Sequence, residues 1–92
     1  MDCNSYSYTV LELYRNDDMS AEITIQRSYN DATVYNVWAG SYDGSMDIYE
    51  SFRTLDAARA LYDNIMDNYT DTPPIKRELN KAIRAAHRME AA

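Results

Sequence analysis

The sequence predicts an α+β fold in which a four-stranded antiparallel meander is followed by two helices packed on one face, in the order ββββαα. Three observations support this prediction. Apolar residues recur with period two before about residue 52 and with helical spacing after it. Turn-forming residues separate the strands by short loops, which favour antiparallel neighbours. At 92 residues we expect a single domain over 1–92, with the sheet at about 6–52.

The first two strands follow from composition and alternation. Residues 6–14 (YSYTVLELY) are rich in aromatic and branched side chains, which favours a strand, and a polar turn follows at 15–18. In residues 21–28 apolar and polar side chains alternate, which indicates a strand with one buried face.

The third and fourth strands are joined by a hairpin signal. A turn at 30–31 precedes the third strand, which is predicted at 33–39. Residues 43–44 are Asp-Gly, and both residue types tolerate positive φ. The fourth strand then covers 46–52.

Two amphipathic helices follow the sheet. Thr54 is a suitable N-cap and Asp56 in the first turn suits the helix dipole, so the first helix is predicted at about 55–69. Prolines at 73–74 fit the first turn of a helix and predict a second helix at about 74–89. Apolar residues follow helical spacing in both: Leu55, Ala58, Leu61, Tyr62, Ile65, Met66 and Tyr69, then Ile75, Leu79, Ala82, Ile83, Ala86 and Met89.

Charge is divided unevenly along the chain. Residues 1–72 carry thirteen acids and four bases (net −9), whereas residues 73–92 carry two acids and five bases (net +3), which gives −6 overall. An acidic body with a basic terminal segment indicates a protein that docks onto a charged partner.

Because no basic or apolar stretch opens the sequence and Cys3 is the single cysteine, we expect a cytoplasmic protein.

The two predicted helices carry opposite charge on their solvent sides. The cations of the second helix, the basic stripe, could contact the phosphates of a nucleic acid, form a solvated face or pair with the acidic body. The carboxylates of the first helix, the acidic stripe, could imitate a phosphate backbone as a DNA mimic or serve solubility. The basic stripe is Arg77, Lys81, Arg84 and Arg88, and the acidic stripe is Asp56, Asp63 and Asp67.

Large apolar groups fall on both sides of the first and third strands. An antiparallel sheet with helices on one face should be mainly polar on the other. Either the tyrosines belong to the core or the second face is a contact surface for a partner or a second copy, because tyrosine buries area yet keeps a polar tip. Strict alternation places Tyr6, Tyr8, Val10 and Tyr14 opposite Leu11 and Leu13, and Tyr35 and Val37 opposite Val34 and Trp38. We call Tyr6, Tyr8, Tyr14 and Tyr35 the tyrosine face.

Residues suited to catalysis are scarce. His87 is the only histidine and Cys3 the only thiol, which excludes a zinc site built from three or four nitrogen and sulfur ligands. Gly40 and Gly44 are the only glycines, so there is no glycine-rich phosphate loop. His87 is expected to be solvated near the helix end. We therefore expect no enzyme, no cofactor, and no catalytic or metal-binding residue.

A short segment invites comparison with a DNA-binding family. Residues 52–63 (FRTLDAARALYD) resemble the strand-to-helix passage of plant-type AP2 DNA-binding domains. Those domains contact DNA through Arg and Trp on their sheet, whereas the strands here offer Arg15, Arg27 and Trp38 amid acids. The resemblance therefore implies shared local packing rather than DNA binding.

The overall layout resembles a second group. A compact, acidic, tyrosine-rich meander followed by two helices is similar to the small phage anti-CRISPR proteins that disable type I surveillance complexes. That resemblance implies stoichiometric, non-catalytic binding in the cytoplasm of an infected bacterial host. It also implies that the acidic stripe faces a cationic protein surface and that the basic stripe contacts guide RNA.

Three hypotheses about function follow. The leading one is a non-catalytic inhibitor, an anti-CRISPR protein, that binds a bacterial CRISPR-Cas effector complex or another nucleic-acid-binding protein. It would block nucleic-acid binding through its acidic and tyrosine-rich surfaces. The second is a small nucleic-acid-binding module that uses the basic stripe. The third is a structural module that either homodimerises through the tyrosine face or serves as an accessory subunit of a larger assembly. In each case we expect a monomer or homodimer without membrane contact, since no apolar run is long enough to span a bilayer.

Overall fold

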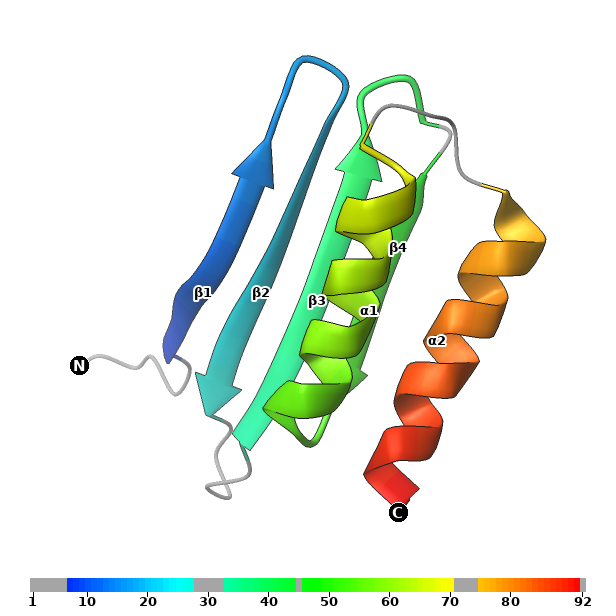
Figure 1. The fold of residues 1–92 in the computed structure, drawn as a ribbon. Coiled ribbons are helices and arrows are strands. Elements are labelled where there is room, and N and C mark those ends of the chain that lie inside the picture. Colours follow the sequence, from blue (N-terminus) through cyan, green and yellow to red (C-terminus); the bar gives the residue numbers. More distant parts are fainter. Residues whose placement is uncertain (1–6, 28–32, 45, 71–74, 92) are drawn as a thin grey trace.

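The computed structural model describes residues 7–27, 33–44, 46–70 and 75–91, with side chains over 9–25, 33–44, 46–70 and 75–90. It confirms the predicted ββββαα fold class (Figure 1). Four antiparallel strands lie in sequence order in one sheet: β1 (Ser7–Arg15), β2 (Met19–Arg27), β3 (Thr33–Ser41) and β4 (Asp47–Phe52). Helices α1 (Leu55–Asn68) and α2 (Lys76–Ala91) follow. Within the described ranges, neither helix has the length and apolar character needed to cross a membrane.

Local hydrogen bonds explain two of the connections. In the β1–β2 turn the Asn16 side chain accepts hydrogen bonds from the backbone N–H groups of Asp18 (2.7 Å) and Met19 (2.8 Å). In the β3–β4 hairpin Gly44 adopts φ 81°, a left-handed conformation that glycine tolerates without strain. The predicted Asp-Gly turn is thus confirmed. The turns predicted at 30–31 and at the prolines 73–74 lie outside the described residues.

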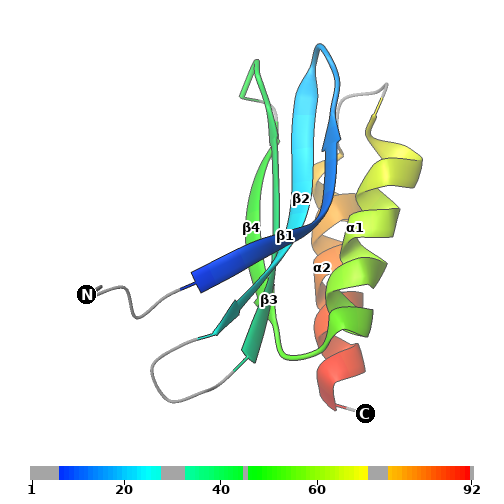
Figure 2. The ribbon, with the colours of Figure 1, turned by 90° about the vertical axis from the view of Figure 1, so that its left-hand side faces the viewer.

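Both helices lie on the same side of the sheet, which leaves the other side uncovered (Figure 2). α1 packs on β2, β3 and β4, whereas among the described elements α2 contacts the sheet at β4 (Figure 1). The core therefore lies between α1 and the sheet, and we call the uncovered side the open face. The buried apolar residues are Met19, Ala21, Ile23, Val37, Ala39, Met46, Ile48, Phe52, Ala57, Ala58, Leu61, Tyr62, Ile65, Tyr69, Leu79 and Ala86.

α1 begins where the sequence predicts. The Thr54 side chain accepts a hydrogen bond from the backbone N–H of Ala57 at 3.2 Å, which satisfies one of the N–H groups that a helix start leaves unpaired. Asp56 lies in the first turn as expected. The helix ends near Tyr69, whose N–H donates to the carbonyl of Ile65.

A bulge in β1 changes which side chains share a face. Val10 pairs with Thr24, but Glu12 pairs with Ile23, so Leu11 is an extra residue in the ladder. Strict alternation is therefore wrong beyond this point, and Tyr14 turns to the helix side instead of joining Val10. A bulge also bends its strand, and Figure 2 shows the first part of β1 bending toward the uncovered side.

α2 buries a narrower stripe than its sequence predicts. Leu79 and Ala86 are buried, but Ile75 and Met89 are 63% and 44% exposed. α1 occupies the centre of the four-stranded sheet, so α2 lies beyond the edge strand β4 (Figure 1).

Candidate functional site

The open face is organised in rows that cross all four strands. Beyond the bulge, the pairing places Leu13, Glu22, Trp38 and Tyr49 next to one another from β1 to β4. We call these four residues the central row. Neighbouring strands are about 4.8 Å apart, so the row spans roughly 15 Å.

Three of the four side chains of the central row are large, apolar or aromatic, and exposed, whereas Glu22 between Leu13 and Trp38 is half-buried. Leu13 is 55%, Trp38 38% and Tyr49 61% exposed. A Cβ on Gly40 would stand 3.5 Å from two atoms of the Trp38 ring, so the indole leans over the glycine backbone. Exposed aromatic side chains on an uncovered sheet face are typical of a surface that binds a protein partner.

The row beside it consists of Val10 and three polar residues, two of which are joined by a hydrogen bond. Val10, Thr24, Asn36 and Ser51 are aligned across the sheet. Asn36 is 4% exposed and accepts a hydrogen bond from the Ser51 hydroxyl at 2.6 Å. This bond joins β3 to β4 beside the central row.

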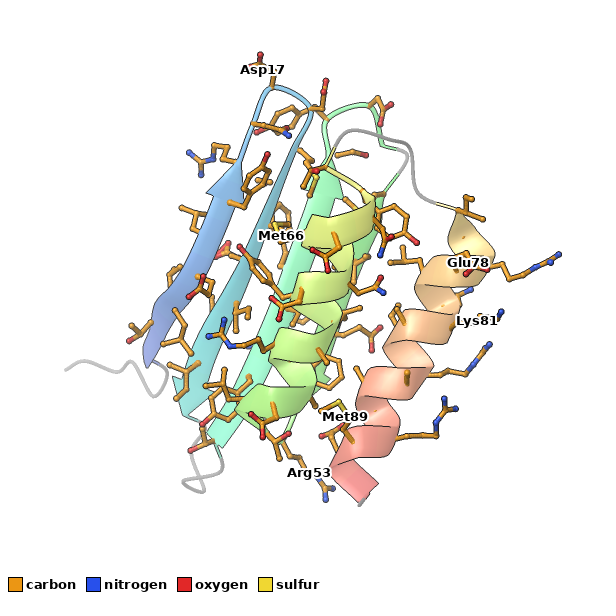
Figure 3. All side chains as sticks on the ribbon, in the orientation of Figure 1. Asp17, Arg53, Met66, Glu78, Lys81 and Met89 are labelled. Atoms are coloured by element: carbon orange, nitrogen blue, oxygen red, sulfur yellow. The ribbon has the colours of Figure 1, made fainter. Side chains whose placement is uncertain are left out.

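One end of the molecule is acidic. The β1–β2 turn carries Asp17 and Asp18, and the β3–β4 hairpin carries Asp43. The two turns are tied together, because the Tyr42 N–H donates to the Asp18 carbonyl at 2.9 Å. Figure 3 shows Asp17 at this end and Arg53 at the opposite one. Asp47 on the open face extends the negative charge toward the central row. We call Asp17, Asp18, Asp43 and Asp47 the acidic end.

Two members of the tyrosine face, Tyr14 and Tyr35, lie on the core side of the sheet, which is one of the two alternatives that the sequence left open. Tyr14 and Tyr35 are half-buried and pack against the core on the helix side. The bulge at Leu11 explains Tyr14, and Tyr35 points to the same side as Val37, which is fully buried. Tyr6 and the Tyr8 side chain lie outside the described residues. The exposed apolar groups of the open face come instead from Leu13, Trp38 and Tyr49, with Val10 from the neighbouring row.

Both charged stripes lie on the helical layer, away from the open face. Asp56, Asp63 and Asp67 are all exposed on α1, and Arg77, Lys81, Arg84 and Arg88 are all exposed on α2. Lys81 lies 3.8 Å from Glu78 (Figure 3), so one cation of the basic stripe has an acidic neighbour on its own helix. Among the described side chains, no carboxylate lies within ion-pair distance of the other three cations.

His87 is a bridge between α2 and β4 rather than a solvated helix-end residue. Its Nε2 is 2.8 Å from Glu50 on β4, and its Nδ1 is 2.8 Å from Glu90 one turn along α2. Its ring also stacks against Phe52 at 4.5 Å. Two carboxylate partners require both ring nitrogens to donate, and only the charged imidazolium does so. The sequence signal was available, because His87 follows Leu79, Ile83 and Ala86 on the inner side of the helix.

The bridge shifts two pKa values in opposite directions. The hydrogen bond from His87 to Glu50, and to a smaller extent the one to Glu90, raise the His87 pKa above its ordinary 6.5. The backbone N–H of Arg53 donates to Glu90 at 2.6 Å, and this bond, followed by the one from His87, lowers the Glu90 pKa below its ordinary 4.5. Elsewhere, burial raises the pKa of Tyr62 and of Tyr69, so both phenols stay neutral.

Within the described part of the chain, no group of three or more His, Cys, Asp or Glu side chains is placed to hold a metal ion. Comparison with protein-family models, with curated proteins and with solved structures finds no match for this chain.

Proposed function

We propose that this protein is a non-catalytic inhibitor, of the anti-CRISPR kind, that docks on the cationic nucleic-acid-binding surface of a bacterial effector complex. The observation that carries the proposal is the open face, where Trp38, Tyr49 and Leu13 stand exposed in one row beside the acidic end. An aromatic centre supplies binding energy through desolvation, and a charged border selects and orients the partner.

The negative charge of this protein favours a partner with a cationic surface. The chain carries a net −6, and the turns that border the open face add carboxylates to that end of the sheet. Lysine- and arginine-rich channels that hold nucleic acid are complementary to such a surface, which would exclude the phosphate backbone from them. Because the acidic stripe lies on the opposite layer, we assign the primary contact to the open face and the acidic end.

The test is inhibition of a purified type I surveillance complex. We expect the protein to prevent binding of target DNA at a stoichiometric ratio, measured by electrophoretic mobility. The double variant Trp38→Ala/Tyr49→Ala should weaken inhibition by about 30-fold, the effect of losing an aromatic hot spot of about 2 kcal/mol. Ile75→Ala is the control, since Ile75 is 63% exposed, much like Tyr49, but lies just before α2, away from the open face.

Two results would contradict the proposal. Absence of inhibition by the unmodified protein at micromolar concentration would remove the anti-CRISPR function. Inhibition that survives in Trp38→Ala/Tyr49→Ala would show that the open face is not the docking surface.

A second candidate function is direct nucleic-acid binding by α2. It is favoured by three exposed arginines, Arg77, Arg84 and Arg88, that lack a carboxylate neighbour among the described side chains. The acidic body opposes it, because it repels phosphates. A gel shift with RNA and duplex DNA at low salt tests it, and loss of any shift in Arg84→Ala/Arg88→Ala would assign the binding to the basic stripe.

A further inference from the structure

A groove runs between the edge strand β4 and helix α2. Its volume is about 430 Å³, which falls in the range of about 300–1,000 Å³ typical of ligand sites. One wall is a single face of α2, formed by Lys76, Leu79, Asn80 and Ile83. The other wall is β4, and it includes Asp47 and Tyr49. The side chains of these two residues belong to the open face. Asp47 and Tyr49 therefore line the groove where the backbone edge of β4 borders it.

The edge of β4 that faces away from β3 carries backbone groups that have no backbone partner among the described residues. β4 has a single neighbour in the sheet, β3. The Ser41 N–H donates to the Met46 carbonyl, so this pair is hydrogen-bonded, and every second pair after it is hydrogen-bonded too. The backbone groups of Asp47, Tyr49 and Ser51 therefore point away from β3.

Helix α2 lies beside the edge of β4 without filling it, because the groove separates the two over part of their length. The register of β3 with β4 is continuous, without a bulge, and β4 contains no proline. At the far end of the groove α2 is held against β4 by a hydrogen bond, in which His87 Nε2 lies 2.8 Å from Glu50 Oε1. The groove is thus closed at Glu50 and open beside Asp47, Ile48 and Tyr49.

We propose that this groove binds an extended peptide segment of a partner protein, which adds to β4 as a fifth strand. An added strand lies about 4.8 Å from its neighbour, which places it between β4 and α2. Alternate side chains of the peptide face the helix side, where Leu79 and Ile83 favour apolar residues. The intervening side chains lie beside Asp47, where cationic residues are favoured.

A peptide suits the site better than a second copy of this chain. The β4 edge of a second copy carries its own α2, so the two helices would meet before the two strands could pair. A single extended segment has no such wall. This site uses the outward backbone groups of β4, whereas the proposed inhibitor surface uses side chains of the open face, and Asp47 and Tyr49 take part in both. Tyr49→Pro against Tyr49→Ala separates the two uses, because both variants remove the side chain and Tyr49→Pro alone removes the N–H.

The test uses a fluorescein-labelled hexapeptide of alternating lysine and valine, blocked at both ends, and measures fluorescence anisotropy with the full-length protein. Two further peptides carry N-methyl groups on the backbone nitrogens, one peptide at its lysines and the other at its valines. Only one set of N–H groups faces β4, so we expect one methylated peptide to bind like the parent and the other to lose binding at least about tenfold.

Variants of the protein sharpen the assignment. Tyr49→Pro removes the outward N–H without breaking the ladder to β3 and should weaken binding about tenfold, whereas Tyr49→Ala, which keeps the N–H, should weaken it far less. Asn80→Phe should block the groove, and Arg84→Phe, on the outer side of the same helix, should not. Circular dichroism checks that each variant is folded.

Three outcomes would overturn the proposal. The first is no binding of the hexapeptide up to about 1 mM. The second is equal binding by both methylated peptides. The third is a dimer, seen by sedimentation, that Tyr49→Pro dissociates while no peptide binds, because a second copy would then be the occupant.

Discussion

The two helices lie on the same face of the sheet but are attached to it differently. α1 lies over β2, β3 and β4 and buries Leu61, Tyr62 and Ile65 together with two alanines. α2 lies beyond the sheet edge, buries Leu79 and Ala86, and is joined to β4 through His87. A four-stranded sheet has room for one central helix. The second helix is consequently a surface element, which leaves its cations exposed and a groove at its inner side.

The largest expected effect tests this difference in burial. Leu61→Ala should lower the free energy of unfolding by about 4 kcal/mol, because Leu61 is fully buried on the sheet side of α1 and its truncation leaves a cavity. Leu79→Ala at the sheet edge should cost about half as much, since the site is open to solvent on the groove side. Urea denaturation of both variants measures this, and equal losses would show that α2 is as integral to the core as α1.

The next effect tests how α1 is fixed at its start. Thr54→Ala removes the acceptor of the Ala57 N–H and should cost about 1 kcal/mol. Thr54→Ser keeps a hydroxyl and is the control, with an expected loss of a few tenths of a kcal/mol at most. Thermal and urea denaturation would measure both. A loss in Thr54→Ser as large as in Thr54→Ala would mean that the threonine methyl, and not the cap, stabilises α1.

Local signals were sufficient to predict most of the fold. The helix start was predicted correctly because Thr54 is a capping residue at the change from period two to helical spacing. The hairpin was predicted correctly because Gly44 tolerates positive φ. Element ends fall within about two residues of the predicted ones, since each is set by neighbours in sequence.

Features that depend on distant partners were missed. The bulge at Leu11 is a choice of register between two strands, and the sequence of β1 alone does not contain it. Relative to strict alternation, that single extra residue turns Tyr14 toward the core and Leu13 toward the open face. The bridge of His87 was missed because Glu50 lies 37 residues earlier and meets it only once α2 has docked. The sites are therefore less predictable than the fold.

The smallest expected effect concerns the bridge that attaches α2. The raised His87 pKa contributes stability that is fully present below its ordinary value of 6.5 and is lost as pH rises through the folded pKa. The lowered Glu90 pKa contributes stability that is present above its ordinary value of 4.5 and is lost as pH falls through the folded pKa. The bridge should thus be strongest between about pH 4.5 and 6.5.

His87→Gln tests this directly, because it removes the charge but keeps a polar side chain of similar reach. The His87 side chain is 39% exposed, so solvent screening should keep the loss at pH 6 below about 1 kcal/mol. The loss should shrink as the pH rises through the folded pKa of His87, where the wild-type imidazole also becomes neutral. Lys81→Gln is the control, since it also removes one charge from an exposed pair on α2, with Glu78, but leaves the bridge to β4 intact. A pH-independent difference between wild type and His87→Gln would show that His87 attaches α2 by packing on Phe52 and not by its charge.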